Sequence, residues 1–159
     1  MKLMLEEWIT GELSIPSQET NGLPLCPYAQ QAWTNDEVKV TWQDISLWKD
    51  VFNEVDKFDD SHKVVICARE NSEQTYEELE HYCFALNAMF AHQGRDIWLL
   101  AFLAGDYTMI FIQRLSHLDS AAAWLEKLGY YKNYDPEDYN RLIAARRTWR
   151  RYDEEKTYA

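Results

Sequence analysis

The sequence predicts an α/β or α+β fold built on a four-stranded mixed sheet with helices packed on it. Three patterns support this prediction. Apolar and polar side chains alternate over residues 38–42, as in a half-buried strand. Lys63–Ala68 is rich in β-branched residues, as in a strand buried on both faces. Two apolar runs, Ile97–Leu103 and Tyr107–Gln113, flank Ala104-Gly105-Asp106, which predicts a hairpin.

Most of the remaining chain shows the periodicity of helices. A capping box of Thr75 and Glu78 opens one helix, and Gly94 ends it. Ser46 and Asp119 are expected to cap two others. The expected helices are Leu3–Leu13, a helix after Ser46 with the stripe Leu47, Val51, Phe52, Val55 and Phe58, Tyr76–Gln93, Ala121–Leu128, and Asp135 to about Lys156. The predicted order is therefore α-loop-β-α-β-α-β-β-α-α.

One domain is expected, because 159 residues suffice for a single hydrophobic core. Residues 1–34 form an N-terminal helix and a long loop, since Ser14–Pro27 contains three of the four prolines and an Asn-Gly pair. Residues 37–131 form the α/β core, and residues 135–157 form the C-terminal helix. Long loops in compact domains are often functional, so the loop is a place to look for a site.

Composition excludes several classes of protein. The net charge of -11 opposes binding to nucleic acid or to anionic membranes, both of which need lysine and arginine. No apolar run reaches membrane-spanning length, and no secretory leader is evident, so we expect a cytoplasmic protein. Three scattered cysteines form neither a disulfide framework nor a Cys-x-x-Cys site.

The most distinctive segment is Gly22–Ala29, which reads Gly-Leu-Pro-Leu-Cys-Pro-Tyr-Ala. Together with Trp8 it resembles a family of uncharacterised bacterial proteins that carry, near the N-terminus, a tryptophan, a short spacer and a Gly-x-x-Leu-Cys-Pro-Phe-Ala-like segment. The resemblance covers about one fifth of the chain. It implies no activity, because the function of that family is unknown.

Cys26 has two interpretations. A cysteine that leads into a helix can have its thiolate stabilised by the helix N-terminus, and the lowered pKa makes it reactive. Such a cysteine, with His117 and Arg114 from the corner after the last strand, forms a candidate catalytic set. Alternatively, Leu25-Cys26-Pro27-Tyr28 is an apolar plug that holds the loop against the core, because free cysteine behaves as a small hydrophobic residue. The sequence favours the plug.

No cofactor or metal site is predicted. Glu78 and His81 have the spacing of a carboxylate-bridged di-iron pair, but a single copy supplies too few ligands. His92 is expected in solvent, like His81. A phosphate-binding loop is absent from the sequence, which has five glycines in all.

The C-terminal region combines arginines with a tryptophan. Because the protein is acidic, we expect this cluster to pair within the chain or with a protein partner rather than with nucleic acid. The chain also contains seven tryptophans and ten tyrosines, residue types that anchor protein interfaces. The candidate binding residues are Arg146, Arg147, Trp149, Arg150 and Arg151.

These observations favour a non-catalytic accessory or inhibitory factor of bacterial or phage type that binds another protein or itself. The alternative is a small cysteine-dependent enzyme that uses Cys26 with His117 and Arg114.

Overall fold

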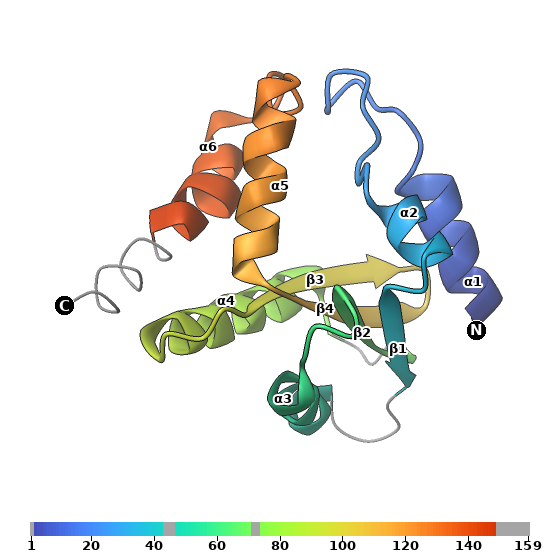
Figure 1. Cartoon of the computed structure of the whole chain (residues 1–159), viewed down its shortest axis with the longest axis vertical. Coiled ribbons are helices and arrows are strands. Elements are labelled where there is room, and N and C mark those ends of the chain that lie inside the picture. The colour runs from blue at the N-terminus through green and yellow to red at the C-terminus, as the bar shows by residue number, and fades with distance from the viewer. Residues whose placement is uncertain (1, 43–46, 71–73, 149–159) are drawn as a thin grey trace. The chain divides into compact units, whose positions relative to one another are not determined.

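The computed structural model describes residues 2–42, 47–70 and 74–148. It divides the chain into two compact units (Figure 1). The sheet unit comprises residues 36–115, and the helical unit combines residues 1–35 with residues 116–159. The sequence prediction places residues 37–131 in one α/β core, whereas the structure assigns residues 116–131 to the helical unit. The expected cap Ser46 lies outside the described residues.

The sheet unit contains the predicted four-stranded mixed sheet, in the order β1-β2-β4-β3. The strands are β1 (Val38–Trp42), β2 (Val64–Glu70), β3 (Trp98–Ala104) and β4 (Tyr107–Gln113). β1 is parallel to β2, and β4 is antiparallel to both of its neighbours. The predicted hairpin is confirmed, because Ala104 pairs with Tyr107 across Gly105 and Asp106. Gly105 has a φ of 57°, which glycine adopts without a Cβ clash.

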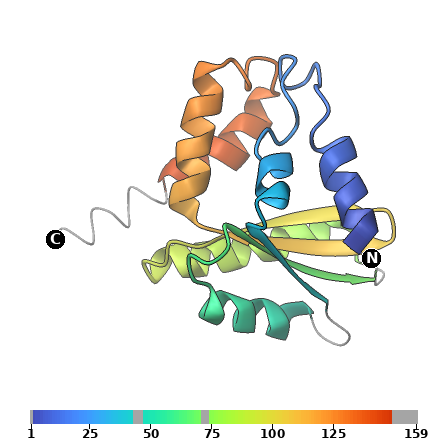
Figure 2. The same cartoon turned by 45° about the vertical axis from the view of Figure 1, so that its right-hand side comes forward.

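Two helices, α3 (Leu47–Lys57) and α4 (Tyr76–His92), pack on the same face of the sheet (Figure 2). The predicted capping box of Thr75 and Glu78 begins α4. β2 is buried on its other face as well, as predicted, since Ile66 and Ala68 are inaccessible. The core beneath α3 and α4 consists of Val51, Val55, Val65, Cys67, Leu79, Cys83, Leu86, Phe90, Ile97, Leu99, Ala101, Ile110 and Ile112.

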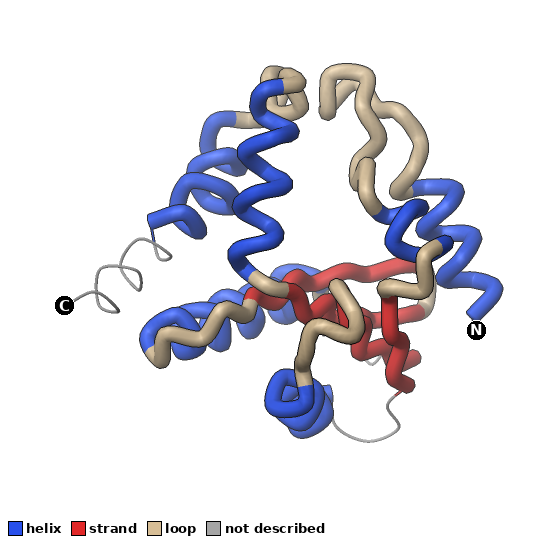
Figure 3. Tube along the Cα trace, in the orientation of Figure 1, coloured by secondary structure: helices blue, strands red, loops and turns tan. Residues whose placement is uncertain are grey.

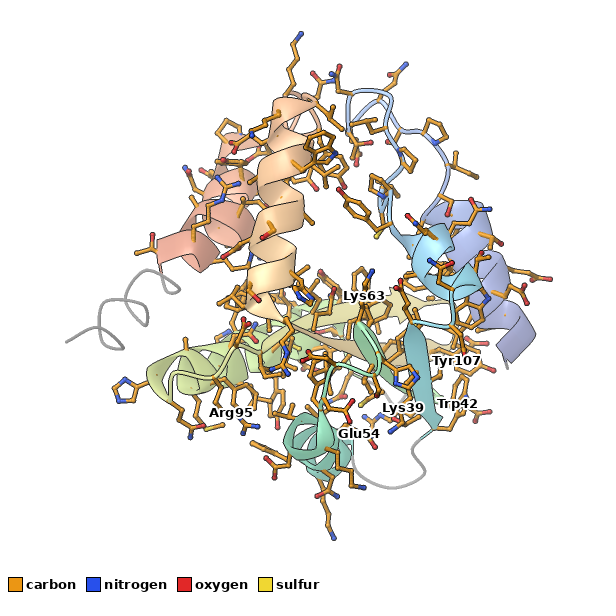
Figure 4. The ribbon with its side chains drawn as sticks, in the orientation of Figure 1. Lys39, Trp42, Glu54, Lys63, Arg95 and Tyr107 are labelled. Carbon is orange, nitrogen blue, oxygen red and sulfur yellow. The ribbon has the colours of Figure 1, made fainter. Side chains whose placement is uncertain are left out.

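Polar contacts fix α3 against the rest of the sheet unit. Lys39 on β1 forms a 3.1 Å ion pair with Glu54 on α3 (Figure 4). Arg95, which follows α4, lies 3.3 Å from Asp56 and stacks over the ring of Phe90. These pairs are partly exposed, so each contributes at most about 1 kcal/mol. They orient the helix rather than supply its stability.

A side chain of α4 forms hydrogen bonds with the backbone of the edge strand β3. The Asn87 amide nitrogen donates to the Leu99 carbonyl oxygen at 3.0 Å, and the Leu99 N–H donates to the Asn87 amide oxygen at 2.7 Å. Asn87 thereby occupies the hydrogen-bonding positions that a further strand would use. Its side chain is buried, so both bonds are shielded from water.

The helical unit is formed by both ends of the chain (Figure 3). Its elements are α1 (Lys2–Glu7), the π-helical turn η1 (Trp8–Glu12), α2 (Ala29–Thr34), α5 (Leu115–Lys127, whose first residue belongs to the sheet unit), α6 (Pro136–Tyr139) and the π-helical turn η2 (Asn140–Ala144). The loop between η1 and α2 closes on itself through a bridge of Pro16 to Pro24. The last helix begins at the predicted place, with Asp135 as the cap of α6, and the helical backbone continues to residue 148.

The start of α5 was not predicted correctly. The sequence prediction begins this helix at Ala121 with Asp119 as its cap, but α5 begins at Leu115, directly after the last strand. Leu115 is buried, which anchors the first turn. Asp119 lies within the helix, where its carboxylate pairs with an arginine instead of capping backbone amides.

Candidate interaction surface

Helix α5 turns its two carboxylates toward residues 136–148, which comprise α6, η2 and the helical turn after them and are called the C-terminal helix below. Asp119 and Glu126 are seven residues apart and therefore share one side of α5. Asp119 lies 2.9 Å from the guanidinium of Arg146, and both side chains are almost buried. Glu126 lies 3.1 Å from Arg147 and accepts a hydrogen bond from the Tyr139 hydroxyl. That hydrogen bond, with the nearby guanidinium, lowers the pKa of Glu126. α5 and the C-terminal helix consequently lie side by side (Figure 1).

The opposite side of α5 carries two large exposed apolar side chains, Trp124 and Leu128, beside the half-buried Ala121. Trp124 is 56% exposed and Leu128 is 49% exposed, which are large values for such side chains. The Leu128 N–H still donates to the Trp124 carbonyl oxygen, so Leu128 continues the helical register. We call the four residues His117, Ala121, Trp124 and Leu128 the outer face of α5. It holds no carboxylate, because Asp119 and Glu126 are the only acids in residues 115–128.

The far end of α5 is held against the N-terminal loop. The Tyr130 hydroxyl donates to the Leu25 carbonyl oxygen, and the Asn133 side chain donates to the Gln18 carbonyl oxygen at 2.8 Å. Tyr130 belongs to a cluster of four rings packed mainly edge to face, formed by Tyr130, Tyr131, Tyr134 and Tyr139. The loop therefore packs within its own unit, as the plug interpretation of this segment requires.

The plug is only partial. The sequence prediction buries Leu25 and Tyr28, but both side chains are exposed, whereas Cys26 and Pro27 are half-buried. The hydrogen bond from Tyr130 reaches the backbone of Leu25 and needs no burial of its side chain. The loop is thus held mainly by its backbone, and it adds two apolar side chains to the surface of the helical unit.

The environment of Cys26 disfavours a reactive thiol. Burial raises the pKa of Cys26, and the backbone N–H groups of Tyr28 and Ala29 lower it by less. The helix N-terminus therefore acts in the expected direction, but desolvation outweighs it. A thiol with a raised pKa stays protonated at neutral pH, and the thiolate is the nucleophile. Cys67 and Cys83 are buried in the sheet unit.

Arg114 and His117 are the other two residues of the candidate catalytic set, and each lies in another part of the structure. Arg114 belongs to the sheet unit, where it lies 3.4 Å from Asp60 and over the ring of Phe58. His117 is exposed in the first turn of α5, about three helical turns from the end of the helix where Tyr130 contacts the Cys26 segment. This placement separates His117 from Cys26 within the helical unit.

Two arginines of the predicted cluster form ion pairs within the chain. Arg146 and Arg147 pair with the two carboxylates of α5, which agrees with the expectation of internal pairing. Trp149, Arg150 and Arg151 lie outside the described residues. Sequence reasoning missed the exposed pair Trp124 and Leu128. The signal that could have found it is the 4-3-4 spacing of the outer face together with the two acids on the other side.

Among residues 2–42, 47–70 and 74–148, no three His, Cys, Asp or Glu side chains lie close enough together to hold a metal ion. Glu78 is engaged in the capping box, and His81 is exposed. No helix in this part of the chain is long and apolar enough to cross a membrane. Searches against family models, curated proteins and solved structures found no match for this chain.

Proposed function

We propose that this protein is a non-catalytic interaction factor of the cytoplasm that binds a protein partner through the outer face of α5. The observation that carries the proposal is the exposure of Trp124 and Leu128 on a helix side without carboxylates. Burying a large apolar side chain contributes roughly 1.5–3 kcal/mol. Tryptophan is also among the residues that most often dominate binding energy at interfaces.

The distribution of charge supports the same surface. Residues 36–115 contain 15 Asp+Glu and 7 Lys+Arg, so the sheet unit carries a charge of -8. Acidic surfaces disfavour binding to polyanions and to other acidic proteins. The helical unit, which contains the outer face of α5, carries the remaining -3 of the total charge of -11, and the only ionisable side chain of the outer face is His117. The outer face itself therefore brings no carboxylate into a contact with a partner.

Photo-cross-linking tests the proposal. Benzoylphenylalanine replaces Trp124 in one variant and Ile15 in a matched control, since Ile15 is 58% exposed in the same unit. Irradiation in native cells should give a discrete product of higher mass from position 124 and none from position 15. Mass spectrometry then identifies the captured chain. If position 124 yields no product, or the same products as position 15, the proposal is wrong.

A further inference from the structure

We propose that the partner of the outer face of α5 is the same face of a second copy, paired antiparallel about a twofold axis between Ala122 and Ala123. This inference rests on the proposed function, because it names the occupant of the same surface. It follows from the spacing of the outer face, from its charge and from its length.

The residues of the outer face have the same spacing when they are counted from either end of the helix. His117, Ala121, Trp124 and Leu128 are separated by four, three and four residues. In an antiparallel pair, Trp124 therefore meets Ala121 of the second copy, and Leu128 meets His117 of the second copy. A large ring against a small side chain is the arrangement that lets two helices interdigitate. Alternating steps of three and four residues are also the spacing of a coiled-coil seam.

The distribution of charge favours self-pairing through the outer face of α5 over self-pairing through other parts of the surface. Two copies that each carry a charge of -11 repel one another, and the repulsion is smallest where they meet at a face without acids. Asp119 and Glu126 are turned away and neutralised by Arg146 and Arg147. Lys127, beside the outer face, would lie next to Ser120 of the second copy. The two Lys127 side chains would be roughly 13 Å apart along the axis, beyond the screening length of about 8 Å at physiological salt.

The size of the face sets the expected affinity. A helix of 13 residues is about 20 Å long. One pair of such helices buries less than the roughly 1,200–2,000 Å² of a stable interface. We therefore expect a reversible dimer with a dissociation constant on the order of micromolar.

Sedimentation equilibrium of the full chain over about 1–300 μM tests this pairing, since that range brackets micromolar affinity. The wild-type protein should pass from the 18.9 kDa monomer to twice that mass. Leu128→Glu should remain monomeric, because it places a carboxylate in the apolar seam. Ile15→Glu, an equally exposed control, should dimerise like the wild type. Circular dichroism verifies that each variant is folded.

A second substitution tests the register. In Leu128→Glu/His117→Lys, each glutamate faces the lysine of the other copy, so dimerisation should return. Residues 117 and 128 are about 16 Å apart along one helix, so this rescue cannot occur within one chain. A wild-type monomer throughout, a dimeric Leu128→Glu variant, or a double variant that stays monomeric would each overturn the inference. A monomeric wild type that still cross-links a different protein from position 124 leaves the proposed function standing.

Discussion

Asp119 and Arg146 form a nearly buried ion pair between α5 and the helix that follows it in the chain. The two groups lie 2.9 Å apart, with side chains 12% and 6% exposed, and 27 residues separate them along the chain. Because the guanidinium holds the Asp119 side of α5 against the C-terminal helix, Trp124 is left on the opposite side. This pair, together with the buried Ala122 and Leu125, therefore sets which surface of α5 is available for binding.

Replacing Arg146 with methionine should strongly destabilise the helical unit. Removing one partner of a buried pair leaves a poorly solvated charge and costs about 3–5 kcal/mol. The double variant Asp119→Leu/Arg146→Met should recover most of that loss, since it removes both charges. Urea unfolding followed by far-ultraviolet circular dichroism measures the free energy of unfolding. A loss below about 0.5 kcal/mol in the single variant would contradict a structural role for the pair.

Replacing Asn87 with leucine should destabilise the sheet unit. The leucine fills a similar volume but leaves the N–H and carbonyl of Leu99 without the hydrogen bonds that Asn87 makes. An unsatisfied buried polar group costs about 1–3 kcal/mol. Asn87→Asp keeps an acceptor for the N–H but places a second acceptor against the carbonyl, so it should also lose stability. Urea midpoints equal to that of the wild type would show that water replaces both bonds.

Stability should fall at alkaline pH. Burial raises the pKa of Tyr131 and of Cys83 to about 12, and it raises the pKa of Tyr130 as well. The unfolded chain loses these protons first, near the ordinary values of 9.0 for cysteine and 10.0 for tyrosine. The stabilisation is therefore complete below pH 9 and is lost as the pH rises from 9 through 12.

Urea midpoints between pH 7 and 11 measure this loss. Tyr131→Phe should make the decline less steep, because it removes one of the titrating groups, whereas Tyr28→Phe at an exposed position serves as the control. Midpoints that stay constant up to pH 11 would be inconsistent with desolvated tyrosine and cysteine side chains.

Cys26 should react slowly with iodoacetamide at pH 7. Its raised pKa leaves little thiolate, so the native rate should lie below that of the urea-unfolded chain and should increase with pH. Cys26→Ala should destabilise the protein only mildly, because the side chain is half-buried. Rapid, selective alkylation of Cys26 in the native protein would instead favour the cysteine-dependent enzyme. Peptide mass spectrometry identifies which cysteine is labelled.

Local signals in the sequence were enough to predict the four-stranded mixed sheet and the elements that form it. The Thr75 and Glu78 capping box, the two-residue turn at Gly105 and the β-branched run of β2 each involve residues close together in the chain. Asn87 was not predicted, because its partner Leu99 belongs to another element, and an asparagine within a helix pattern does not indicate which backbone it will contact.

The sequence by itself determined that residues 121–128 form a helix, but not that the helix begins at Leu115 or which part of its surface is buried. Leu118, Leu125 and Leu128 all lie within one broad apolar arc of α5, so the periodicity does not tell which part of that arc is buried, as Leu125 is, and which is exposed, as Leu128 is. Only the tertiary structure decided which part of the α5 surface is buried. Arg146, from a helix distant in the sequence, places its charge beside Asp119, because a nearly buried carboxylate is stable only beside its cation, and Arg147 pairs with the more exposed Glu126.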